Sequence, residues 1–88
     1  MSPYAAALAN IQAVIDSGGQ IMVGTVAPIR GAAVAHDGGK TLVMLRRRPR
    51  EAISDLLARL DAAIATAKAT GTRVDEINTS TSDRRYEL

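Results

Sequence analysis

QIMVGTVAPIRGAAVAHDGGKTLVMLRR, residues 20–47, is the stretch of sequence that decides the fold. It consists of three β-rich blocks, at residues 20–26, 29–36 and 40–47, which are separated by turn residues. The triplet DGG at 37–39 lies between the second and third blocks, and glycine supplies the positive backbone angles that a tight hairpin requires. The pair AP at 27–28 interrupts the first two blocks. The stretch therefore predicts a three-stranded antiparallel meander.

Both alternating sets of side chains in these strands are partly apolar. In the first strand, Met22 is predicted to lie on one face and Ile21 and Val23 on the other. In the third strand, Leu42 and Met44 are predicted to share one face, and Val43 and Leu45 the other. An antiparallel sheet that helices cover on one side normally shows polar residues on the other side. The second apolar face is therefore expected to meet another subunit, and Met22 and Met44 are the candidate interface residues.

A first helix is predicted over residues 3–17. Ser2 and Pro3 are typical of a helix start, and Gly18 with Gly19 is typical of a helix end. One face of this helix is apolar and carries, at the helical spacing, Tyr4, Ala7, Leu8, Ile11, Val14 and Ile15. That face is expected to pack on the sheet.

A second helix is predicted over residues 49–69, with Pro49 and Glu51 in its first turn and Gly71 at its end. Its apolar stripe is continuous and consists of Ile53, Leu56, Leu57, Leu60, Ala63, Ile64 and Ala67. Asp55 and Arg59 are spaced as an i,i+4 ion pair on the outer side. Residues 73–77 are suited to a brief edge strand.

The predicted fold is thus α+β, a two-layer sandwich of order α-β-β-β-α in which the meander packs on two helices, with a possible short C-terminal edge strand. Residues 1–78 are interpreted as a single domain and residues 79–88 as a mobile polar tail. Only 2% of the 88 residues are aromatic, so small side chains must fill the core. Association commonly supplements the stability of such a small domain, and we expect a homodimer.

Several classes of site are disfavoured by composition. The chain has no cysteine, which excludes disulfides and thiolate sites and suits a cytoplasmic location. No apolar run approaches the ~20 residues of a membrane span, and residues 1–15 do not resemble a secretory signal. No membrane partner, no cofactor, no metal and no small-molecule substrate is expected.

Two stretches invite a catalytic interpretation. GGKT at 38–41 resembles the end of a phosphate-binding loop, but the motif's first glycine would fall at Val34, and a strand follows instead of a helix. His36 beside Asp37 has the pairing of an oriented general base, yet no second histidine, cysteine or carboxylate pair completes a constellation. We therefore predict a non-enzymatic protein, in which His36 is a strand-end residue beside a turn.

The most conspicuous charged cluster lies where the third strand leads into the second helix, and consists of Arg46, Arg47, Arg48 and Arg50. Such a cluster at a helix start is suited to binding several phosphates, and is equally typical of a solvated strand end. The helix-strand-strand-strand-helix order resembles that of double-stranded-RNA-binding domains. In that family a lysine-rich motif running into alanines opens the second helix. Arg47, Arg48 and Arg50, followed by Ala52, correspond to that motif in basic character. The sequence therefore predicts a self-associating interaction module, with duplex-backbone nucleic-acid binding as the alternative.

Overall fold

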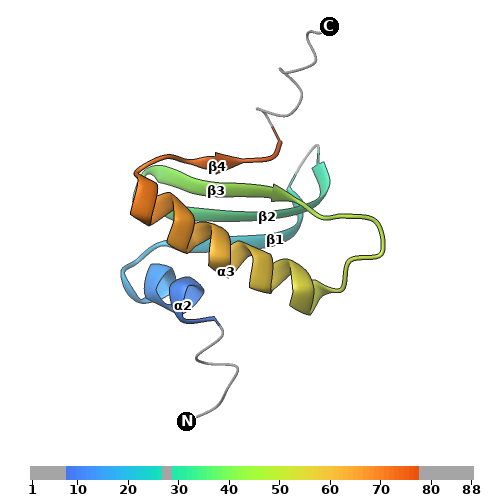
Figure 1. Cartoon of the computed structure of the whole chain (residues 1–88), viewed down its shortest axis with the longest axis horizontal. Helices are drawn as coiled ribbons and strands as arrows, with labels where there is room; N and C mark the ends of the chain where they lie inside the picture. The colour runs from blue at the N-terminus through green and yellow to red at the C-terminus, as the bar shows by residue number, and fades with distance from the viewer. Residues whose placement is uncertain (1–7, 27–28, 78–88) are drawn as a thin grey trace, which may run out of the picture.

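The computed structural model describes residues 8–26 and 29–77 (Figure 1). Its elements follow one another in the order α2 (Ala9–Asp16), β1 (Gln20–Val26), β2 (Ile29–Asp37), β3 (Lys40–Arg46), α3 (Ile53–Thr70) and β4 (Val74–Asp75). The predicted α+β fold, with three strands between two helices, is confirmed, and each of these three strands lies within one residue of its predicted bounds. The Ala27-Pro28 turn, the Ser2-Pro3 helix start and the 79–88 tail lie outside the described residues.

The four strands form one open sheet in the order β1-β2-β3-β4. The first three strands are antiparallel, and Asp37 pairs with Lys40 across a two-residue turn in which Gly38 has a φ of 65°. The predicted edge strand is present as β4, which runs parallel to β3. A parallel partner requires a crossover connection, and α3 provides it.

A register shift in the β2–β3 ladder places Leu42 on the other face of the sheet from the predicted one. Ala35 pairs with Val43 and His36 pairs with Thr41, so Leu42 is an extra residue without a partner in β2. Such a bulge turns two successive side chains toward the same side. Leu42 therefore packs in the same cluster as Val43, beneath the helices, and does not share the face of Met44 as strict alternation predicts.

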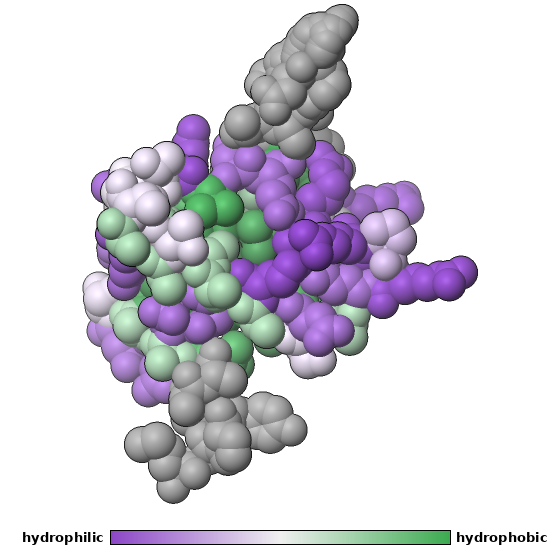
Figure 2. Space-filling view, viewed as in Figure 1, coloured by the Kyte–Doolittle hydropathy of each residue, from purple (hydrophilic) through white to green (hydrophobic). Residues whose placement is uncertain are grey.

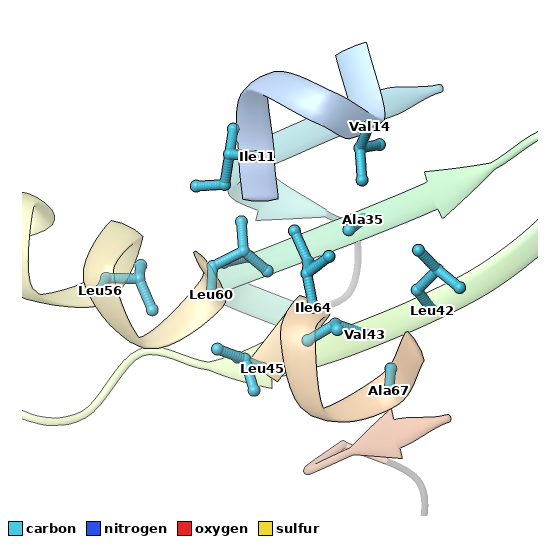
Figure 3. Close-up of a cluster of buried hydrophobic side chains, with 11 residues drawn as sticks. Ile11, Val14, Ala35, Leu42, Val43, Leu45, Leu56, Leu60, Ile64 and Ala67 are labelled. Carbon is cyan, nitrogen blue, oxygen red and sulfur yellow. The ribbon is translucent and has the colours of Figure 1, made fainter. Parts of the chain in front are cut away.

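Both helices cover the same face of the sheet (Figures 1 and 3). Between them and the sheet lies the main core, to which α2 contributes Ile11 and Val14 and α3 contributes Leu56, Leu60 and Ile64. The sheet side of this core is made of Ala33, Ala35, Leu42, Val43 and Leu45, and the last turns of α3 add Ala67. The predicted stripe of α3 is thus confirmed at its centre, whereas Ile53 at its start is 45% exposed.

Within the described residues, the first predicted helix is present as α2. Leu8 has non-helical backbone angles and is the N-cap of α2, so this helix begins at Ala9, and predicted helix residues 3–7 lie outside the described residues. Ile15 was predicted to lie on the buried face but is 52% exposed, because the helix presents Ile11 and Val14 to the core instead. The helix ends as predicted, before Gly18.

A buried carboxylate from the second helix caps the first. Asp61 is 7% exposed, and its two oxygens accept hydrogen bonds from the backbone N–H of Ile11 at 2.9 Å and from the side chain of Asn10 at 3.0 Å. The Leu8 side chain cannot satisfy the free amides at this helix start, so α3 supplies the acceptor. Asp61 therefore ties the two helices together over the sheet.

The second helix begins four residues later than predicted, at Ile53. Pro49 and Arg50 form a turn, and Arg50 has a φ of 64°, which is incompatible with a right-handed helix. Pro49 and Glu51 therefore precede the helix, and Asp55 is the acidic residue of its first turn. Gly71 ends the helix in the left-handed conformation, as predicted.

Candidate functional site

The face of the sheet opposite the helices carries a second apolar cluster. Its centre is one row of side chains that crosses three strands, because Met22 pairs with Val34 and Val34 pairs with Met44. The cluster consists of buried Ala32, Val34 and Ile77 with half-buried Met22, Ile29 and Met44 packed against them. No helix in the described part of the chain covers this face, which we call the open face (Figure 1).

A row of small residues lies next to the methionine row on the open face. The register aligns Gly24 with Ala32 beside the Met22–Val34–Met44 row. Ala32 and Val34 are 0% and 2% exposed, because the half-buried side chains of the same cluster and Ile77 pack over them. The candidate interface residues Met22 and Met44 therefore lie together on one face, on either side of a buried valine.

The two ends of the open face are polar. At one end His36 and Thr41 are register partners, and Thr41 Oγ1 lies 3.0 Å from His36 Nδ1. At the other end Arg46 pairs with Ala32 and is exposed. The side-chain partner of His36 is thus Thr41 and not its sequence neighbour Asp37. Within residues 8–26 and 29–77, no group of three His, Asp or Glu residues is arranged to hold a metal ion.

The arginine cluster is exposed but divided between the two sides of the sheet. Arg46 belongs to the open face, whereas Arg47 lies over Gly31 on the helix side and donates from Nε to the carbonyl of Glu51 at 2.8 Å. Arg48 and Arg50 belong to the connection before α3. Figure 2 shows hydrophilic residues gathered where β3 leads into α3. The four arginines thus lie at the end of β3 and in the connection that leads to α3, and not in the first turn of the helix.

A fifth arginine, absent from the predicted cluster, organises this connection. Arg59 makes an ion pair with Glu51 at 2.7 Å and another with Glu76 at 3.1 Å, and it donates to the carbonyl of Arg46 at 3.0 Å. The Arg59 guanidinium and the backbone N–H of Arg48 lower the pKa of Glu51 to about 2. The same carboxylates raise the pKa of Arg59.

The predicted i,i+4 pair of Asp55 with Arg59 is wrong, since Arg59 turns to Glu51 and Glu76 instead. These two glutamates precede and follow α3 in the sequence, so helical periodicity gives no signal of the contact. The Arg59 network anchors the connection whose other arginines are exposed.

Comparison of the chain with protein-family models, with curated proteins and with solved structures found no match. No helix among the described residues combines the length and the apolarity needed to cross a membrane.

Proposed function

We propose that the protein is a small non-enzymatic module that associates with a second copy of itself through the open face of its sheet. The observation that carries this proposal is the row of Met22, Val34 and Met44, which is apolar across three strands and has no helix of the described chain above it. Contiguous apolar surface of this kind, rimmed by polar residues, is typical of protein–protein contacts. Here the rim is formed by His36 and Arg46.

The shape of the open face favours a second copy as the partner. In a two-fold dimer the same patch contacts itself, so each raised feature needs a depression on the same surface. The methionine row and the exposed Gly24 are neighbours on the sheet. A two-fold axis between them sets the half-buried methionines of one protomer against Gly24 of its partner, as in sheet-on-sheet packing.

The limited size of the core supports the same proposal. The chain contains no Phe and no Trp, and the described core is built from Ala, Val, Leu and Ile. A domain of this length buries a small fraction of its surface, and association adds the missing apolar burial. The second face is the described apolar surface that remains for that purpose.

Light scattering over a concentration series tests this proposal. We expect a dimer mass for the wild type at about 100 µM, and a shift toward monomer in Met44→Glu, because a buried unpaired charge is strongly unfavourable. Ile15→Glu is the matched control: it places the same charge on an exposed apolar residue of α2, and should stay dimeric. A wild type that remains monomeric throughout, or an equal effect of both variants, contradicts the proposal.

A second candidate is binding to a nucleic-acid backbone, which the exposure of Arg46, Arg47, Arg48 and Arg50 favours. Retardation of duplex RNA or DNA should then weaken steeply with salt, because each neutralised phosphate releases counterions. Replacing Arg47 and Arg50 by glutamine should reduce the salt slope by about one per lost contact. No retardation at low salt and tens of micromolar protein contradicts this candidate.

We also propose a cytoplasmic location. The absence of cysteine supports it, because proteins of a reducing compartment are not stabilised by disulfides. Fractionation of cells that produce the tagged protein tests it. Recovery in the cytosolic fraction is expected, and recovery in a membrane or secreted fraction contradicts it.

A further inference from the structure

A hollow of about 290 Å³ lies on the surface at the end of α3, away from the Met22–Val34–Met44 row and from the arginine cluster. Figure 1 shows that the end of α3, the start of β3 and the approach to β4 meet at this end of the molecule. Its volume is at the lower end of the range for small-molecule sites. The lining residues are Asp37, Lys40, Thr41, Leu42, Ala67, Lys68, Gly71, Thr72 and Arg73.

Three cationic side chains from three segments line this hollow: Lys40 from β3, Lys68 from the last turn of α3, and Arg73 from the loop before β4. Asp37 is the one carboxylate among the lining residues, so the lining has an excess of two positive charges. Asp37 and Lys40 are register partners, yet among the described residues neither Lys40 nor Lys68 makes an ion pair within 4.0 Å. Two lysine charges therefore lack a carboxylate partner here.

Arg73 is held only loosely. Its Nε lies 3.8 Å from an Asp75 oxygen, and its side chain is 56% exposed. A guanidinium carries five N–H donors, so this one long contact leaves most of them available. Charged hydrogen bonds from lysine and arginine to phosphate oxygens are among the strong ones.

The rest of the lining provides hydroxyl groups and an apolar floor. Thr41 and Thr72 contribute the hydroxyls, and Leu42 and Ala67 lie at the bottom as part of the main core. Thr41 Oγ1 also lies 3.0 Å from His36 Nδ1, so Thr41 connects the hollow to the polar end of the open face.

We propose that this hollow binds a small phosphate monoester with an apolar body. A phosphate monoester carries about −1.5 to −2 charge at pH 7, opposite in sign to the side chains of Lys40, Lys68 and Arg73. Its three oxygens suit donors that come from three different segments, and the apolar body covers Leu42 and Ala67. The proposal is independent of self-association, because the lining of the hollow includes neither Met22, Val34 nor Met44.

Titration of ¹⁵N-labelled protein with phenyl phosphate at constant ionic strength tests this site by NMR. We expect the amides of Thr41, Gly71 and Thr72 to shift and to saturate with a Kd of about 1 mM, a typical affinity for so small a ligand. Inorganic phosphate should bind more weakly than phenyl phosphate, because it lacks the apolar body. Equal affinity for both overturns that part of the proposal.

The variant Lys40→Gln with Lys68→Gln should lose at least about tenfold in affinity, which corresponds to 1.4 kcal/mol. The matched control, Arg47→Gln with Arg50→Gln, removes the same charge elsewhere and should change affinity less than about twofold. An equal loss in both variants, or no saturable shift in the wild type, overturns the site. If the double lysine variant fails to fold, Lys68→Gln alone replaces it, because Lys68 is exposed on α3. Its loss of affinity for phenyl phosphate is then compared with that of the arginine control in the same way.

Met44→Glu separates the two proposals. It lies outside the lining of the hollow, so it should bind phenyl phosphate as the wild type does, whatever its oligomeric state. Loss of binding in Met44→Glu contradicts the placement of the site on the helix side.

Discussion

The two faces of the same sheet are built from neighbouring residues and have different surroundings. Strand β2 directs Ala33 and Ala35 toward the helices, and Ala32 and Val34 toward the open face. The first pair is covered by leucine and isoleucine from α2 and α3, whereas the second pair is flanked by methionines of β1 and β3. Similar strand residues thus form a large core under two helices on one side and a smaller cluster, which includes Ile77 and the half-buried methionines, on the other.

The largest difference between the faces is expected on truncation of the helix-side core. Leu60 is fully buried, and Leu60→Ala should lower the free energy of unfolding by about 2–5 kcal/mol, the usual cost of such a cavity. Met44→Ala, measured at a dilution where the protein is monomeric, should cost less than about 1 kcal/mol because Met44 is only half-buried. Denaturant melts of the two variants make the comparison, and equal losses would show that the faces are equally closed.

A second prediction concerns the close packing of Gly19, just after α2, against Val14 and the backbone of His36. The backbone N–H of Gly19 donates to the carbonyl of Val14 at 2.8 Å, and a Cβ at Gly19 would collide with the carbonyl oxygen of His36 and with Val14. Gly19→Ala should therefore cost about 1–3 kcal/mol, in the range for overpacking. Gly39→Ala is the control, since its Cβ meets no atom within 4 Å and it should melt near the wild type. A Gly19→Ala variant as stable as Gly39→Ala contradicts this account of the turn.

The cap that joins the two helices is expected to have an intermediate effect. Asp61→Ala leaves the buried N–H of Ile11 without its acceptor and should cost about 1–2 kcal/mol. Hydrogen exchange should rise first in α2, because α3 keeps its own core contacts. Asp61→Asn retains an acceptor and should lose less. Uniform protection of α2 in Asp61→Ala would show that the cap is not what holds this helix.

The smallest effect is expected at the Arg59 network, in which the Arg59 and Glu76 side chains are 20% and 36% exposed, so solvent screens part of the interaction. The pKa of Glu51 falls from 4.5 to about 2 in the folded protein, so its ionised form favours folding. This contribution is complete above pH 4.5 and is lost as the pH falls toward 2. Glu51→Gln should therefore flatten the decline of the melting temperature in that window. An unchanged decline in the variant, at low salt, contradicts the assignment.

Much of the fold is predictable because its signals are local. The DGG triplet at 37–39 specifies the hairpin, the leucine spacing of α3 specifies its buried stripe, and Gly71 specifies its end. The start of α3 is mispredicted because Pro49 and Glu51 favour a helix start by type, whereas Arg50 adopts a positive φ that no residue preference announces.

Other features that the sequence does not reveal depend on contacts between residues distant in the chain. Asp61 caps a helix 50 residues away, and Arg59 pairs with a glutamate 17 residues away. The alignment of Met22 with Met44 also needs the observed register, because the bulge at Leu42 shifts part of β3 by one residue. Alternation alone predicts that both faces are apolar, and not which side chains share one of them.

The most direct test of the central claim is isotope-filtered NMR on a mixture of two protein samples. One sample carries ¹³C-labelled methionine methyl groups and the other is unlabelled, so any observed contact between them is intermolecular. Self-association through the open face predicts contacts from the Met22 and Met44 methyl groups to Gly24 and Ile29 of the other protomer. A dimer that shows no such contact, or shows contacts at the exposed Ile15 and Ile53 instead, contradicts the account.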